Sequence, residues 1–136
     1  MLERVGLPIG ALILFGVWGF FSKLATDNIE PKSALVYYAL GIAVVGIFAL
    51  GLVGWKPETD SKGVIFAFVG GASAAFGGLL FLITLSTGTA SRAVAITALY
   101  PVVTTVLTII VLHETVSLKE AAAVMMAIVA LVLYST

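Results

Sequence analysis

The sequence predicts an all-α integral membrane protein, a single domain over residues 1–136 with five transmembrane helices. Composition gives the first two indications, since 61% of the residues are hydrophobic and 10% are charged, against about 25% charged in soluble domains. The mean hydropathy is +1.20, and a chain this small cannot bury so much apolar surface in its own core. A spanning helix needs about 20 apolar residues, and five such runs fit between short polar loops.

The first predicted span runs from Val5 to Ala25. This apolar run is longer than the core of a signal peptide, which has about 7–15 residues, so we expect it to remain as a helix. A polar loop from Thr26 to Lys32 follows. Pro31 suits the first turn of the next helix, where its missing N–H is harmless. The second predicted span runs from Ser33 to Trp55.

The third predicted span runs from Gly63 to Ser86, after a second loop from Lys56 to Lys62. Asp60 or Ser61 is placed to cap the start of this helix. Small residues recur at every fourth position on one face of it, a pattern that lets helices approach closely in lipid. These structural candidates are Gly70, Ala74 and Gly78.

The fourth predicted span, from Ser91 to Leu112, contains a proline about ten residues into the run. Pro101 removes one backbone donor and crowds the carbonyl four residues earlier, which belongs to Thr97. Neighbouring helices and hydroxyl side chains re-satisfy such backbone groups in a membrane bundle. We therefore predict that Pro101 bends this helix.

The fifth predicted span runs from Leu118 to Tyr134. Ser117 and Glu120 have the spacing of a capping box at its start. A row of alanines marks this helix as a second candidate packing surface, beside the small-residue face of the third span. Its members are Ala123, Ala127 and Ala130.

Four short strings resemble the EamA-like domain, the repeat unit of the drug/metabolite transporter superfamily. They are Gly16–Ala25 with its Trp-Gly pair and following lysine, Leu99–Val103, His113–Glu114 and Ser117–Leu118. The resemblance covers nearly the whole chain as one unit. It implies tandem units of opposite orientation, with a substrate site between them near the midplane. It also implies that Glu114, which matches the glutamate after helix four, fixes the hairpin between the last two spans.

Three residues of the first two spans are candidates for substrate contact. Trp18 either packs between helices or forms one wall of a cavity, and Lys23 either reaches the lipid headgroups or attracts an anionic group at a cavity mouth. Tyr37 and Tyr38 either anchor the helix at the interface or include one cavity residue, since adjacent helical positions diverge by about 100°. We take Tyr37 as the candidate. Many relatives carry an arginine near this part of helix two, and its absence here weakens the case for anion recognition.

The remaining candidates for substrate contact lie around the proline of the fourth span. Five of them follow the spacing of one helical face, which we expect to point inward because hydroxyls in lipid need partners. Hydrogen bonding between helices is the alternative role for this face. The candidates are Thr97, Tyr100, Pro101, Thr104, Thr105 and Thr108.

Several function classes have no support in the sequence. The chain has no cysteine and one histidine, which leaves no thiolate or histidine cluster for a metal. Its formal net charge is zero, so nucleic-acid binding lacks the basic surface it requires. We find no hydrolase triad, phosphate-binding loop or cofactor fingerprint, and we expect no enzyme, no cofactor and no metal. The absence of a carboxylate near the middle of any span argues against proton coupling of the small multidrug resistance kind.

The distribution of Lys and Arg bears on assembly. Five spans place Arg4, Lys56, Lys62 and Lys119 on one side and Lys23, Lys32 and Arg92 on the other. A difference of four against three is too small for basic loop residues to set one topology. We therefore expect a half-transporter for a small metabolite or drug-like solute, acting as an antiparallel homodimer in a prokaryotic inner membrane. The alternatives are a structural or regulatory membrane subunit without transport and a lone repeat that represents an intermediate in transporter evolution.

Overall fold

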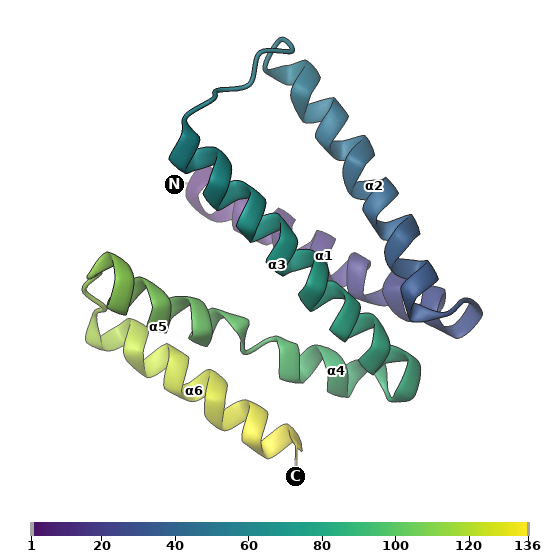
Figure 1. Cartoon of the computed structure of the whole chain (residues 1–136). Coiled ribbons are helices and arrows are strands. Elements are labelled where there is room, and N and C mark those ends of the chain that lie inside the picture. Colours follow the sequence, from purple (N-terminus) through teal and green to yellow (C-terminus); the bar gives the residue numbers. More distant parts are fainter. Residues whose placement is uncertain (1, 136) are drawn as a thin grey trace. The chain divides into compact units, whose positions relative to one another are not determined.

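The computed structural model describes residues 2–135, which form six α-helices and contain no strand (Figure 1). The helices are α1 (Leu2–Asn28), α2 (Pro31–Leu52), α3 (Ser61–Thr87), α4 (Ala90–Thr97), α5 (Tyr100–Leu112) and α6 (Leu118–Ser135). The prediction of an all-α fold is confirmed. The helices outnumber the predicted spans because the fourth span is interrupted and forms both α4 and α5.

The helices belong to two compact units, Met1–Thr87 and Gly88–Thr136. In the first unit, α3 packs against both α1 and α2. In the second unit, α4 packs against α6.

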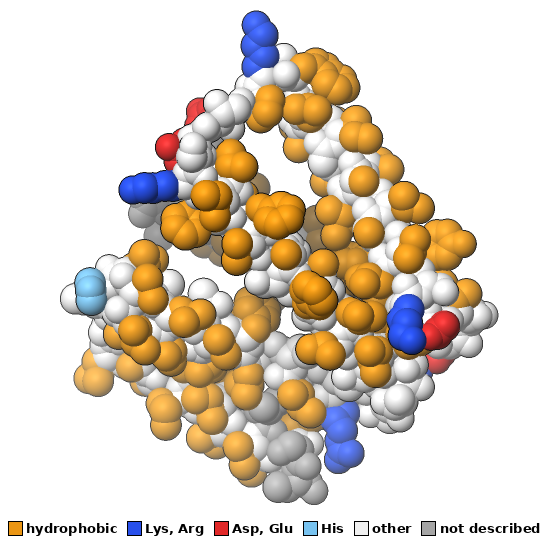
Figure 2. All heavy atoms as spheres, viewed as in Figure 1, with side chains coloured by type: hydrophobic (Ala, Val, Ile, Leu, Met, Phe, Trp, Pro, Cys, Tyr) orange, Lys and Arg blue, Asp and Glu red, His pale blue; other side chains and the backbone are white. Residues whose placement is uncertain are grey.

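Four segments of the described residues are long and apolar enough to cross a membrane. They are Val5–Asn28, Pro31–Leu52, Ser61–Thr87 and Ala90–Leu112, where the last combines α4 and α5. Large apolar side chains lie exposed along these helices, and Figure 2 shows charged side chains mostly near helix ends and loops on the viewed face. Lipid is the solvent that such a surface requires. The fifth predicted span coincides with the 18-residue helix α6, whose role as a span stays a prediction.

Local side-chain contacts explain where the first helices end. Much of the predicted first loop is helical, because α1 continues to Asn28, whose amide donates to the Leu24 carbonyl at 2.7 Å. Pro31 occupies the first turn of α2, as predicted. The helix α2 ends before two residues of left-handed backbone, Gly54 (φ 64°) and Trp55 (φ 61°).

The predicted caps are present in the structure. Asp60 accepts a hydrogen bond from the Gly63 N–H at 2.8 Å and so caps α3. Glu120 accepts from the Ser117 N–H at 2.8 Å, while the Ser117 hydroxyl accepts from the Glu120 N–H at 3.3 Å. This reciprocal pair is the capping box expected at the start of α6, and it satisfies two backbone donors that the helix itself leaves free.

The interruption between α4 and α5 lies at Ala98 and Leu99, just before Pro101. The Ala98 N–H still bonds the Val94 carbonyl at 2.8 Å, but the Leu99 N–H bonds only as far back as Ile96, at 3.3 Å. A proline cannot donate to the carbonyl four residues earlier, so the helix ends at Thr97 and starts again at Tyr100. The predicted bend is therefore a break.

Candidate functional site

An aromatic cluster joins the three helices of the first unit. The Trp18 ring of α1 stacks on Phe81 of α3, with ring centroids 4.9 Å apart and planes 21° apart. The Tyr38 ring of α2 lies 5.9 Å from Trp18 at 42°. Gly78 packs against this tyrosine, and a Cβ there would lie 3.5 Å from Tyr38 Cε1, an ordinary van der Waals distance. Trp18 thus packs between helices, which is one of its two predicted roles. It also borders a pocket, which is compatible with the other, the wall of a substrate cavity.

That pocket has a volume of about 190 Å³ and lies within the first unit. Its lining is mainly aromatic and aliphatic, and none of the lining side chains carries a formal charge. The aromatic members are Trp18, Phe21, Tyr37 and Tyr38; the others are Ser22, Ala25, Ile29, Ala34 and Leu82. We call it the Trp18 pocket.

The Trp18 indole nitrogen is a buried polar atom. Nε1 has no hydrogen-bond partner among the residues that the structure describes. Buried indole N–H groups usually find an acceptor, and an unmet donor costs free energy where water is excluded.

Lys23 is engaged by neighbouring groups at the end of α1. Its ammonium donates to the Asp27 carboxylate at 2.6 Å and to the Leu85 carbonyl of α3 at 3.1 Å. The side chain is 28% exposed, and the lysine stabilises the last turn of α3 by bonding one of its terminal carbonyls. The structure therefore gives Lys23 a structural role, and its charge is balanced by Asp27. Anion attraction by this lysine stays a prediction.

The two tyrosines of α2 both line the Trp18 pocket but differ in burial. Tyr38 is half-buried and contacts Trp18 and the Gly78 position. Tyr37, the candidate from sequence, lines the Trp18 pocket but is 66% exposed. The sequence indicated that only one of the two could face the other helices, and the ring contact with Trp18 belongs to Tyr38. Substrate contact by Tyr37 stays a prediction. Ala34, one turn before Tyr38, is buried. The spacing of four residues places both on one helical face, and this was the signal in the sequence that could have identified Tyr38.

Three buried residues around the Trp18 pocket were not predicted from the sequence. Ser22 is buried at the pocket, and Phe81 and Leu82 are buried on α3. Phe81 and Leu82 occur in a run that is apolar on every side, where periodicity does not separate a packed residue from a lipid-facing one. Only the contacts with α1 and α2 distinguish them.

The small-residue face of α3 serves packing at one end only. Gly78 is buried against Tyr38, whereas Gly70 and Ala74 are exposed. A Cβ on Gly70 would meet nothing within 4 Å. The face contributes to packing within the first unit at Gly78, whereas Gly70 and Ala74 remain exposed and available for contact with another helix.

In the second unit, three of the four candidate threonine hydroxyls bond backbone carbonyls of their own helices. Thr97 donates to the Ala93 carbonyl at 2.9 Å. Thr104 donates to the Tyr100 carbonyl at 3.2 Å, and Thr108 donates to the Thr105 carbonyl at 3.0 Å. These hydroxyls therefore do not require a partner on another helix, because helical Ser and Thr can donate to a backbone carbonyl of the preceding turn. Their presence alone does not indicate an inward-facing surface.

The exposure of this face is mixed. Thr105 and Thr108 are half-buried, while Thr97, Pro101 and Thr104 are exposed. The last member of the group, Tyr100, is 64% exposed. Substrate contact by these six residues stays a prediction.

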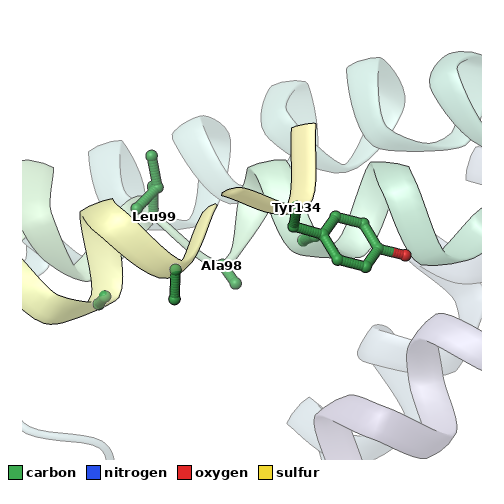
Figure 3. Close-up of a pocket in the computed structure, with 6 residues that line it drawn as sticks. Ala98, Leu99 and Tyr134 are labelled. Atoms are coloured by element: carbon green, nitrogen blue, oxygen red, sulfur yellow. The ribbon is translucent and has the colours of Figure 1, made fainter. Parts of the chain in front are cut away.

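The break between α4 and α5 borders a second pocket, of about 360 Å³, within the second unit. Figure 3 shows Ala98 and Leu99 at the break and Tyr134 on α6, three of the residues that line it. Ala95, Ala127 and Ala130 complete the lining. Two members of the alanine row on α6 thus face this pocket.

The turn after α5 is built by the backbone. His113 adopts left-handed φ of 55° and ends the helix. The Glu114 N–H donates to the Thr108 carbonyl, at 3.3 Å. Glu114 thus contributes to the turn between α5 and α6 through its amide. Among the described residues, no group of three His, Cys, Asp or Glu side chains is placed to hold a metal ion.

Comparison with known proteins assigns the chain to a family. The model of the EamA-like transporter family matches residues 5–136. A relative, an uncharacterized protein of Methanocaldococcus jannaschii, is 27% identical over 127 residues, which cover 90% of this chain and 89% of the relative. No solved structure matches the chain. Together with four span-length segments, the family indicates a multi-pass membrane protein of transporter type. The resemblance noted in the sequence is confirmed, and the chain belongs to the EamA-like transporter family.

Proposed function

We propose that this chain is a half-transporter that moves a small metabolite or drug-like solute by alternating access, as an antiparallel homodimer in the inner membrane of a prokaryote. The observation that carries the proposal is the family match, which extends over residues 5–136 as one unit. Alternating access in folds of this kind works between two units of opposite orientation. In the proposal, a second copy of the chain supplies the second unit.

The charges of the loops support insertion in both orientations. The chain has seven Lys and Arg residues in total, and the predicted five spans divide them as four and three. Two of them are paired with acidic neighbours, Lys23 with Asp27 at 2.6 Å and Lys32 with Glu30 at 3.5 Å. Basic loop residues orient a membrane protein only when one side has a clear excess.

Two exposed surfaces are suited to an antiparallel contact. A two-fold axis in the membrane plane requires a surface that is complementary to itself. Gly70 and Ala74 of α3 are exposed and small, and Ala123 of α6 is exposed as well. Small residues of this kind permit close helix contact in lipid.

Transport is tested with purified protein in proteoliposomes, using labelled amino acids and ethidium as metabolite-like and drug-like solutes. We expect accumulation or release of at least one solute above protein-free vesicles. Absence of flux with gradients of either sign contradicts transport and favours a membrane subunit without transport. The family match does not favour that alternative.

Dual topology is tested by cysteine accessibility, which the cysteine-free sequence makes simple. Glu58→Cys in the loop after α2 should be labelled from both sides of the membrane in a mixed population. Labelling from one side only contradicts dual topology.

The charge balance is tested by added lysines. The double variant Glu58→Lys, Thr59→Lys should fix one orientation and, expressed alone, should abolish flux, because two more charges give that side a clear excess. Co-expression with an Asn28→Lys, Glu30→Lys variant of opposite orientation should restore flux.

A further inference from the structure

We propose that the break between α4 and α5 is a hydrated binding site for a primary amide group, which donates to free backbone carbonyls and accepts from a free backbone N–H. The binding assignment stands on the geometry of the second unit. That the amide is part of the transported solute rests on the proposed transport function.

The acceptors are backbone carbonyls that the interrupted helix leaves without a partner. In a continuous helix, each carbonyl accepts from the N–H four residues later. At the break, the Leu99 N–H bonds the Ile96 carbonyl at 3.3 Å and the Val102 N–H bonds the Leu99 carbonyl at 2.9 Å, so neither reaches its regular acceptor. Pro101 has no N–H to offer. Among the described residues, three carbonyls consequently accept no hydrogen bond, those of Ala95, Thr97 and Ala98.

One backbone donor is free at the same place. The Tyr100 N–H, the first of α5, has no hydrogen-bond partner within the part of the chain that the structure describes. The break therefore offers more acceptors than donors on adjacent stretches of backbone. A primary amide has the complementary set, with two N–H donors and one carbonyl oxygen.

The free carbonyls are directed into the break and are accessible there. A helical carbonyl points toward the residue four positions later, so those of Ala95 and Thr97 point from α4 toward α5. Thr97 and Ala98 are both exposed. Ala95, Ala98 and Leu99 also line the pocket of about 360 Å³ in this unit, which gives room for a small solute beside the break.

The depth of the break explains why these groups need a polar partner. Together α4 and α5 form the candidate span Ala90–Leu112, and the break lies near its middle. Unsatisfied backbone is strongly unfavourable in hydrocarbon and is tolerated only inside protein or along a water-filled cavity. Because Thr97 and Ala98 are exposed, we infer that water reaches the break until a ligand replaces it.

The charges around the site favour a neutral group. None of the residues that line the pocket is charged, and the only polar side chain among them belongs to Tyr134. The partial negative charge at the end of α4 is opposed by the partial positive charge at the start of α5. An ion would lose its hydration without gaining a counter-charge, whereas an amide can bond both helix ends.

Access of water to the break is tested by labelling single cysteines with a charged methanethiosulfonate reagent. Ala98→Cys keeps the backbone carbonyl, because only the side chain changes. Its thiol should react, since a hydrated thiol forms the reactive thiolate and a thiol in apolar surroundings does not. Val103→Cys is the control, because this exposed position of α5 lies at similar depth but outside the pocket; it should not react.

The amide is tested by protection of Ala98→Cys from this reagent. Three probes share one ring: cyclohexanecarboxamide, its N,N-dimethyl derivative, which keeps the oxygen but has no N–H, and the anionic cyclohexanecarboxylate. We expect saturable protection by the primary amide. Either of the other two probes should require a concentration about tenfold higher or more, because the hydrogen bonds to the carbonyls are lost.

Removal of the break is the sharper test, because side-chain substitutions leave the carbonyls in place. Pro101→Ala restores an N–H, and a continuous helix uses these carbonyls in its own hydrogen bonds. Binding of labelled cyclohexanecarboxamide to purified protein, measured by equilibrium dialysis, should be lost in Pro101→Ala. It should be kept in Val102→Ala, which adds no donor.

Each result decides the proposal. It is overturned if Ala98→Cys reacts no faster than Val103→Cys, if the dimethyl derivative or the carboxylate protects as well as the primary amide, or if Pro101→Ala leaves amide binding unchanged. Failure of transport is recognised separately. Amide binding to a protein that carries no solute in vesicles contradicts the transport function and leaves the binding assignment intact.

Discussion

Replacement of Pro101 with alanine should convert α4 and α5 into one continuous helix. The new N–H would lie opposite the Thr97 carbonyl, four residues earlier. Ala98 has φ −60° and ψ −7°, and Leu99 has φ −81° and ψ −5°. A rotation of about 35° in each ψ would bring these two residues to helical values, without leaving the right-handed region.

The magnitude follows from the position of the proline. Proline costs about 3 kcal/mol relative to alanine in a helix interior, but at the first turn of α5 most of this penalty is avoided. The gain is therefore close to one net hydrogen bond, about 0.5–1.5 kcal/mol. Pro101→Ala should raise the free energy of unfolding in detergent by that amount, while flux falls if the break is needed for alternating access.

Spin labels on Val94→Cys and Ile110→Cys measure the change, because both positions are exposed. Sixteen residues of continuous helix separate labelled positions by about 24 Å. Pro101→Ala should move the distance to this value, whereas Val102→Ala, which adds no donor, should leave it as in the unsubstituted chain. Equal distances with and without Pro101 would show that the proline does not cause the break.

Three further substitutions test the contacts of the fold. Gly78→Ala should be tolerated, because its Cβ would lie 3.5 Å from Tyr38; Gly78→Leu should displace that ring and lower stability by about 1–3 kcal/mol in detergent melting. Lys23→Met removes the ion pair with Asp27 and should lower stability by about 1 kcal/mol or less; a larger loss in the same melting assay would mean that its bond to the α3 carbonyl dominates. Ser117→Ala removes the cap of α6 and should cost about 1 kcal/mol, with faster hydrogen exchange in the first turn of that helix as its signature.

Local features of the sequence predicted much of this structure. Pro101 marked the place where the fourth span breaks, because its effect depends only on the missing N–H and on the preceding turn. Ser117 and Glu120 marked the capping box for a similar reason, since both bonds are made within four residues. The first loop was predicted too long, because the helix-extending bond from Asn28 to the Leu24 carbonyl uses a residue type that also occurs in loops.

The sequence by itself determined that the chain is helical and embedded in lipid, because apolar run length and the scarcity of charge decide both without reference to any partner helix. The tertiary structure decided which side chains meet. It placed Phe81 and Tyr38 against Trp18 and bound Lys23 to the end of α3. A helix that is apolar on every side does not record which face is covered, since lipid and protein are equally apolar solvents for it. The buried Trp18 donor therefore becomes visible only when α1, α2 and α3 are packed together.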